Sequence, residues 1–228
     1  GSSLSWSPDS RSIVFSANRD DPDFDVRNSE VFEISVASGE LTQLTDRFGP
    51  DGNAALSPDG SMIAYTGFDD EYQGYQIAHL YVMNRDGSGS HMVSDLDRNF
   101  GGLNWADDGQ GLYFQYDDEG MSKVAYVSLE GRVEDLAEDL GGVGLGRPYG
   151  GGSYTVAPGG RFAFTHTSPS HPADVAVGQR GREAHRRPRR EAHPGAAARH
   201  GAGTGLSRLG AADRFPALAR SDLSLARL

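Results

Sequence analysis

The sequence predicts an all-β protein, a partial β-propeller of about four four-stranded antiparallel blades in an open arc. Three observations predict this fold. One tight-turn motif occurs four times, its copies are separated by 50, 49 and 51 residues, and each copy is followed by alternating apolar residues. Short strands repeated at this spacing are typical of propeller blades, which bury their faces against one another.

The repeated turn joins the first and second strands of each predicted blade. Its clearest copy reads Ser-Pro-Asp-Gly at 57–60. Proline presets φ at the second position, and glycine or aspartate tolerates the left-handed conformation that a tight turn needs. The four copies lie at 6–10, 56–60, 105–109 and 156–160, and the second strands are expected at 13–15, 63–65, 112–114 and 162–164. Trp6 and Trp105 end equivalent first strands, so both are expected to pack between blades.

The third and fourth strands of each blade form a second hairpin. Third strands are expected at 31–36, 80–83, 124–127 and 175–177, and short fourth strands at 41–45, 91–93 and 133–136. The blades then span 1–49, 50–98, 99–149 and 150–181. Blade one is expected to begin with a truncated strand, and blade four to lack its fourth strand. A plain antiparallel sandwich is the alternative, but four copies of one turn in the same register argue against it.

Composition divides the chain near Gln179. The whole sequence has 21 Lys and Arg, 32 Asp and Glu, and a formal charge of −11. Residues 1–179 hold 10 of the basic and 28 of the acidic residues, whereas 180–228 hold 11 arginines and 4 acidic residues. The absence of cysteine excludes a disulfide framework and thiolate metal ligands. No apolar run reaches the length of a membrane span, so no membrane partner is expected.

The stretch 182–228 is rich in Arg, Ala, Gly and Pro, whose codons consist largely of G and C. We interpret it as a GC-rich coding sequence read out of frame from about residue 180; the alternative is a natural basic tail. It is expected to be disordered or weakly helical, and not to complete blade four. Its arginine cluster at 186–190 has no neighbouring aromatic residue for base stacking, so no nucleic-acid partner is expected.

Several phrases of the first 179 residues carry a family resemblance. Trp-Ser-Pro-Asp at 6–9 and Leu-Tyr-Val-Met-Asn-Arg-Asp-Gly-Ser-Gly at 80–89 resemble the propeller repeat shared by TolB and the prolyl oligopeptidase family of serine peptidases. The phrases at 28–33, 41–47 and 113–118 resemble the bacterial acylaminoacyl-peptidase or dipeptidyl-aminopeptidase branch. The resemblance implies a propeller that admits peptides and excludes folded proteins from an α/β-hydrolase domain following it in sequence.

That hydrolase domain holds a Ser-Asp-His triad with its serine in a Gly-x-Ser-x-Gly elbow. The sequence contains no such elbow; Ser153, in Gly-Gly-Ser-Tyr-Thr, lacks the final glycine. No catalytic residue is therefore assigned, and peptide substrates are expected to require a missing catalytic domain. The first interpretation is a substrate-gating fragment of a serine peptidase, from the cytoplasm or the periplasm. The alternative is a non-enzymatic, TolB-like propeller that binds proteins.

The candidate site is an acidic rim made by the loops between second and third strands. Its members are Asp20, Asp21, Asp69, Asp70, Asp117 and Asp118. Such loops share one face of a propeller, where carboxylates attract a substrate's amino terminus or a cation. The alternative is that these are ordinary solvated turns.

No metal or cofactor is expected. The spacing at 21–25 fails as a calcium loop, because Val26 and Phe32 occupy the positions that need glycine and glutamate. The four histidines of the repeat region are scattered over different blades. The glycine-rich run at 141–146 links blades three and four and opens no helix. The uncovered faces of blades one and four are expected to make the isolated chain self-associate.

Overall fold

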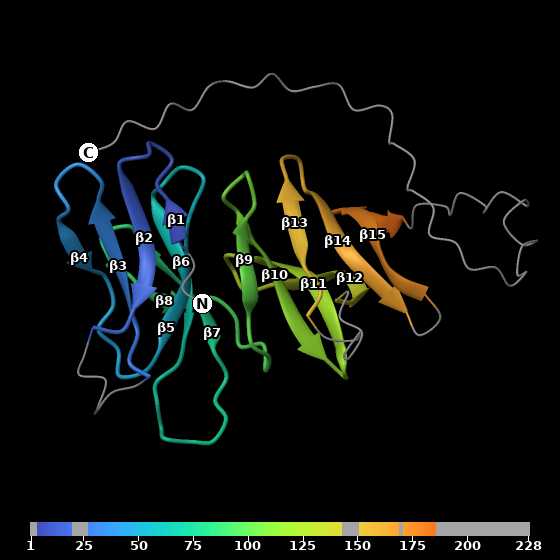
Figure 1. Ribbon diagram of the computed structural model, residues 1–228, viewed down its shortest axis with the longest axis horizontal. Helices are drawn as coiled ribbons and strands as arrows, with labels where there is room; N and C mark the ends of the chain where they lie inside the picture. The colour runs from blue at the N-terminus through green and yellow to red at the C-terminus, as the bar shows by residue number, and fades with distance from the viewer. Residues whose placement is uncertain (1–3, 20–26, 143–150, 169–170, 186–228) are drawn as a thin grey trace, which may run out of the picture. The chain divides into compact units, whose positions relative to one another are not determined.

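The computed structural model describes residues 4–19, 27–142, 151–168 and 171–185. Within these ranges the chain is all-β, and every paired strand is antiparallel to its neighbour (Figure 1). In the described part of the chain, no helix is long and apolar enough to cross a membrane. The predicted β-propeller fold, with four four-stranded antiparallel blades, is confirmed.

The strands of blades one and two follow the predicted order. Blade one consists of β1 Leu4–Trp6, β2 Ser12–Ala17, β3 Glu30–Ser35 and β4 Leu41–Gln43. Blade two consists of β5 Asp51–Leu56, β6 Met62–Gly67, β7 His79–Asn84 and β8 His91–Met92. Each blade is one sheet in which neighbouring strands are also sequence neighbours.

Blades three and four have longer strands. Blade three consists of β9 Gly101–Trp105, β10 Gly111–Asp118, β11 Met121–Ser128 and β12 Val133–Leu140. Blade four consists of β13 Tyr154–Ala157, β14 Arg161–Ser168, β15 His171–Gln179 and β16 Arg182–His185. The two blades are not separate sheets, because Leu140 of β12 pairs with His166 of β14. The repeat did not predict this pairing, which depends on how the two blades meet.

The predicted turns are present at all four positions. Ser10, Gly60, Gly109 and Gly160 have φ angles of 59°, 72°, 66° and 74°, so each adopts the left-handed conformation. In blade one, Ser7 Oγ accepts hydrogen bonds from the backbone N–H groups of Arg11 and Ser12, at 3.1 and 2.9 Å. Asp9 Oδ1 also accepts a hydrogen bond from the Arg11 N–H at 3.1 Å, so the serine and the aspartate of the motif stabilise the turn itself.

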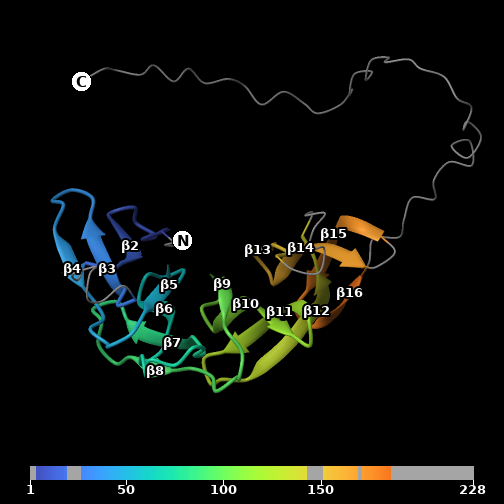
Figure 2. The same cartoon turned by 60° about the horizontal axis from the view of Figure 1, so that its bottom comes forward.

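Figure 2 shows the strands of successive blades following one another in chain order, and each junction between successive blades has its own apolar core. Alternate residues of one strand belong to different cores, as the pleat of a strand requires. Tyr65 of β6 packs toward blade one, and its neighbour Ala64 packs toward blade three. In β10, Phe114 packs toward blade two and Tyr113 toward blade four. The apolar alternation of the repeat thus builds cores between sheets.

The prediction that blade four lacks its fourth strand, and therefore ends at residue 181, is wrong. β16 pairs with β15 through the partners Val177–His185 and Gln179–Arg182. The physical reason is that a strand edge presents backbone N–H and C=O groups that almost any sequence can pair with. Gly181, with φ of 76°, provides the turn. The predictions for 186–228, including disorder or weak helix, lie outside the described residues.

The prediction that both tryptophans pack between blades is half wrong. Trp105 packs against the core between blades two and three, and its indole N–H donates to the carbonyl oxygen of Ala55 at 2.9 Å. Trp6, at the same position of blade one, is 58% exposed. The repeat sets the position of the side chain on its strand, but burial also needs a neighbouring blade.

Candidate functional site

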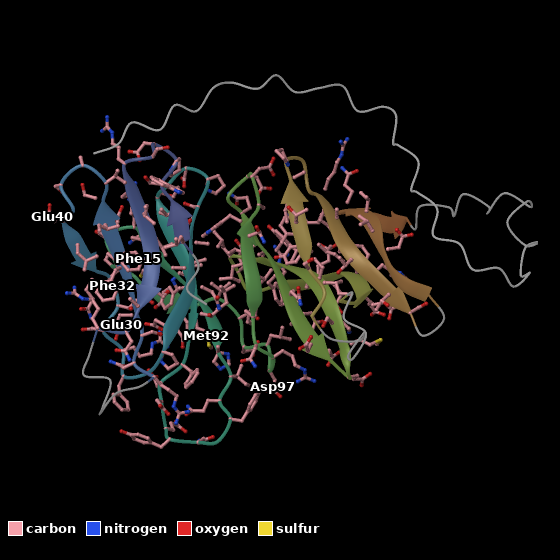
Figure 3. All side chains as sticks on the ribbon, viewed as in Figure 1. Phe15, Glu30, Phe32, Glu40, Met92 and Asp97 are labelled. Atoms are coloured by element: carbon pink, nitrogen blue, oxygen red, sulfur yellow. The ribbon has the colours of Figure 1, made fainter. Side chains whose placement is uncertain are left out.

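Antiparallel blades bring one set of connections to the same end. The segments 44–50 and 93–100 join successive blades, 68–78 joins β6 to β7, and 119–120 joins β10 to β11. We call this the loop end of the propeller. Figure 3 shows Asp97 at this end, and Glu40 at the opposite end, where the tight turns lie. The four described residues of the predicted acidic rim, Asp69, Asp70, Asp117 and Asp118, lie at the loop end.

Asp69 and Asp70 belong to the loop between β6 and β7. The Asp69 side chain is 81% exposed, and its Oδ1 lies 3.8 Å from Arg47 Nε. Asp70 Oδ1 accepts a hydrogen bond from the backbone N–H of Tyr72 at 2.8 Å. One rim aspartate therefore projects into solvent, and the other braces its own loop.

Asp117 and Asp118 end β10 in blade three. Asp117 accepts a hydrogen bond from the Ser122 hydroxyl. Asp118 lies 3.1 Å from Lys123 Nζ and 2.9 Å from the Arg98 guanidinium. The hydrogen bond from Lys123, followed by the one from Arg98, lowers the pKa of Asp118. Asp118 is thus tied to two cations.

The rim residues are not gathered into one cluster. Asp20 and Asp21 lie outside the described residues. Across the part of the chain that the structure describes, no group of three or more His, Asp or Glu side chains could hold a metal ion. The four described rim aspartates form two separate pairs, one in blade two and one in blade three.

A buried charge network lies beside the rim, and the sequence analysis missed it. Asp51 begins β5 and is completely buried. Its nearest cation is Arg47, with Nε 3.4 Å from Oδ1, and within the described residues neither carboxylate oxygen accepts a hydrogen bond. Arg47 lies over the rings of Tyr81 and Tyr65, 4.0 and 5.9 Å from their centroids.

Burial raises the pKa of Asp51 to about 6, although the charge of Arg47 opposes the rise. The backbone of Asp51 also joins two blades, because its N–H donates to the Ser29 carbonyl oxygen at 2.6 Å. No local pattern separates Asp51 from the exposed aspartates, since its burial arises only when blade one packs on blade two.

The serines and aspartates of the repeat have structural roles. Ser57 donates to Asp59 Oδ1 at 2.6 Å and is buried. This bond and those from Ser61 lower the pKa of Asp59 to about 2. Ser153, the nearest sequence match to an elbow serine, lies next to β13. Its carbonyl oxygen accepts from the Thr165 N–H at 3.0 Å, and its own N–H donates to Thr165 Oγ1 at 3.0 Å. These hydrogen bonds stabilise tight turns and strand pairing, and none of them resembles the surroundings of an elbow serine.

A pocket of about 490 Å³ lies at the opposite end of blade three. Arg180 forms part of its wall and lies 3.8 Å from the centroid of the Tyr126 ring. The other charged residues of its wall are Glu130, Arg132 and Glu134. Because both signs are present, the pocket selects no particular ligand charge.

No protein-family model matches the sequence. The chain is similar to Dipeptidyl-peptidase 5 of Porphyromonas gingivalis, with 26% identity over 142 residues, which cover 59% of this chain and 20% of that protein. The chain thus spans about a fifth of the length of this curated relative.

Solved structures with a similar fold belong to several functional classes. The β-propeller domain of the Trilobed protease from Pyrococcus furiosus has a TM-score of 0.54 and 16% identity, over 78% of this chain and 49% of that one. Oligogalacturonate lyase from Vibrio parahaemolyticus has a TM-score of 0.57 and 11% identity, and the match covers 80% of this chain and 52% of that one. A TolB from Agrobacterium tumefaciens has a TM-score of 0.50 and 22% identity, and the match covers 60% of this chain and 50% of that one. These similarities show a β-propeller; fold alone does not assign an activity.

Proposed function

We propose that this chain is the propeller part of a serine peptidase of the prolyl oligopeptidase family that acts on peptides. The observation that carries the proposal is the similarity to Dipeptidyl-peptidase 5 over 142 residues. The peptidase-like phrases at 28–33, 41–47 and 113–118 support it. In this proposal the propeller restricts access, and the triad belongs to a hydrolase domain outside this chain.

The packing of the blades is consistent with a restricting wall. Each junction has a buried core, and hydrogen bonds such as that from Trp105 to Ala55 cross between blades. Close-packed junctions resist separation because opening them exposes apolar surface to water. A stiff wall selects substrates by size, so short peptides pass and folded proteins do not.

The test uses the uninterrupted gene. Reading the DNA beyond codon 180 in all three frames should reveal a Gly-x-Ser-x-Gly elbow followed by an aspartate and a histidine. The longer product should hydrolyse chromogenic aminoacyl peptides and react with a serine-directed fluorophosphonate, and this chain alone should do neither. The matched control replaces the elbow serine of the longer product with alanine. A frame that stops soon after blade four would overturn the proposal.

The second candidate is a non-enzymatic propeller that binds proteins, as in the TolB-like interpretation. The observation that favours it is the group of exposed aromatic side chains at the loop end, since exposed aromatic clusters are common at interaction surfaces. A reading frame that stops soon after blade four would support this candidate over the peptidase, and capture of a defined partner that depends on these aromatics would then identify the binding surface.

A further inference from the structure

The connection between β6 and β7 displays aromatic rings to solvent. Tyr72 and Tyr75 are 78% and 68% exposed, and Phe48, from the preceding connection, is 48% exposed. The rings of Phe48 and Tyr72 have centroids 5.7 Å apart. Figure 1 shows this connection extending beyond the ends of the strands. Isolated exposed apolar residues are common, but here two rings are in contact and a third is displayed by the same connection as Tyr72. We call Phe48, Tyr72 and Tyr75 the aromatic surface.

The loop that carries the aromatic surface is braced by its own polar groups. Gln76 Nε2 donates to the carbonyl oxygen of Asp69 at 2.7 Å, and Gln76 Oε1 accepts from the Glu71 backbone N–H at 3.0 Å. The Asp70 N–H donates to the Phe48 carbonyl oxygen at 2.8 Å. Asn99 Nδ2 donates to the Tyr75 hydroxyl at 3.0 Å. Binding to a braced loop costs less conformational entropy than binding to a loop that must first be ordered.

The surroundings of the aromatic surface are acidic. Seven exposed carboxylates lie at the loop end: Asp46, Asp69, Glu71, Asp95, Asp97, Asp117 and Glu119. Among the described cations near this loop, Arg47, Arg98 and Lys123 form ion pairs with Asp51, Asp118 and Asp118 respectively. Two further exposed arginines, Arg19 and Arg27, belong to the β2–β3 connection of blade one at the same end, so the exposed carboxylates still outnumber the described cations. The electrostatic potential around the exposed rings is therefore negative.

The chain itself shows which partner chemistry suits exposed tyrosine. Arg47 lies 4.0 Å from the centroid of Tyr81, and Arg180 lies 3.8 Å from that of Tyr126. A guanidinium over a tyrosine ring gains from the ring quadrupole and from stacking. The exposed tyrosines of the loop end offer the same faces to a partner, with carboxylates nearby.

We propose that the aromatic surface, together with Asp69, Glu71 and Asp97, is a docking surface for a basic, arginine-containing peptide segment of a partner protein. Arginine side chains of that segment stack on Tyr72 and Tyr75 and lie near the surrounding carboxylates. Charge complementarity selects this occupant over a neutral apolar one. The proposal is independent of whether the longer protein is a peptidase.

The test measures fluorescence anisotropy of a short labelled peptide in which arginines alternate with glycine and serine, added to the full chain. A matched peptide with glutamate in place of each arginine is the control probe. We expect saturable binding of the basic peptide only, weakened at high salt because exposed charges are screened. The double variant Tyr72→Ala/Tyr75→Ala should weaken binding roughly tenfold, as the loss of two cation–π contacts predicts.

Matched variants separate the proposal from a loss of folding. Tyr72→Phe/Tyr75→Phe keeps both rings and should bind within about twofold of the original chain, because phenylalanine also accepts a cation over its face. Glu71→Gln/Asp97→Asn should weaken binding, whereas Glu40→Gln at the opposite end should not. Equal binding of the acidic peptide, or an unchanged affinity in the double alanine variant, would overturn the proposal. So would light scattering showing that the double alanine variant abolishes dimers, since a second copy would then occupy the surface.

Discussion

Trp105 and Trp6 occupy the same position of two repeats and have different surroundings. The indole of Trp105 meets a core and a carbonyl group of the neighbouring blade, whereas Trp6 is mostly exposed. The third strands differ in the same way. Val124 to Val127 of β11 are all buried. Among the residues of β15 whose burial the structure describes, Ala176 and Gly178 are buried, whereas Val175 and Val177 are 58% and 46% exposed. The inner blades are covered on both faces, and the outer blades on one.

The largest expected effect separates the two tryptophans. Trp105→Ala should lower the free energy of unfolding by about 3 kcal/mol, because it removes a large, partly buried ring that packs against a core, together with an interblade hydrogen bond. Trp6→Ala should cost less than about 1 kcal/mol, since its ring is already solvated. Urea unfolding at neutral pH measures both values. Equal losses would show that Trp6 is buried in solution.

The second prediction compares two carboxylates of blade two. The pKa of Asp51 is about 6 in the folded chain, above its ordinary value of 3.8. The native state therefore holds this proton more tightly, so its stabilising contribution is present below about pH 4 and is lost as the pH rises through 6. This loss amounts to about 2 to 3 kcal/mol of the free energy of unfolding. Asp51→Asn should abolish it, because asparagine does not titrate. Thermal and urea unfolding between pH 4 and 8 measure the difference between the variant and the original chain.

Asp59 provides the opposite case. Its hydrogen bonds lower its pKa to about 2, so its contribution is present above about pH 4 and is lost only as the pH falls through 2. Asp59→Asn should leave the pH dependence of the free energy of unfolding between pH 4 and 8 unchanged. A variant of Asp59 that reproduced the behaviour of Asp51→Asn would contradict the assignment of that titration to the buried carboxylate.

The third prediction concerns the uncovered faces. We propose that the isolated chain self-associates through Leu4 and Trp6 of blade one and the exposed valines of blade four, since exposed apolar patches favour association. Trp6→Ser should weaken association roughly tenfold. Size-exclusion chromatography with light scattering at moderate salt measures this, with Val36→Thr on the same blade as the control. A sharp monomer at all concentrations would refute the proposal.

The smallest expected effects compare one turn position in two blades. Ser10 and Gly60 both have left-handed φ angles. Ser10→Gly should stabilise the chain by about 0.5 kcal/mol, because the relief of steric strain exceeds the entropic cost of glycine. Gly60→Ala should destabilise it by about 1 kcal/mol, since its Cβ would also lie 3.1 Å from Pro8 Cδ. Differential scanning calorimetry resolves both shifts in melting temperature. A lower melting temperature for Ser10→Gly and a higher one for Gly60→Ala would contradict the turn assignment.

The blade repeat was predictable because turns and strand alternation are local properties. The four left-handed turn residues and the apolar strands at 63–65 and 112–114 lie where the pattern places them. The candidate site was less predictable. The pattern placed Asp69 and Asp118 at one end of the blades, although Asp118 ends strand β10 and does not lie in the predicted loop. It did not indicate their cation partners or the aromatic surface, because these contacts join segments that are distant in the sequence.

The sequence by itself determined the strands, the turns and the blade repeat, because each depends on residues within one turn or hairpin of one another. Only the tertiary structure decided which equivalent residues are buried. It packed Trp105 against a core and left Trp6 mostly exposed, and it enclosed Asp51 and raised its pKa. It also paired β16 with β15, although residues 182–185 carry no strand-like pattern. The physical reason is that burial and electrostatics depend on neighbouring blades, and edge pairing depends on backbone groups that every sequence shares.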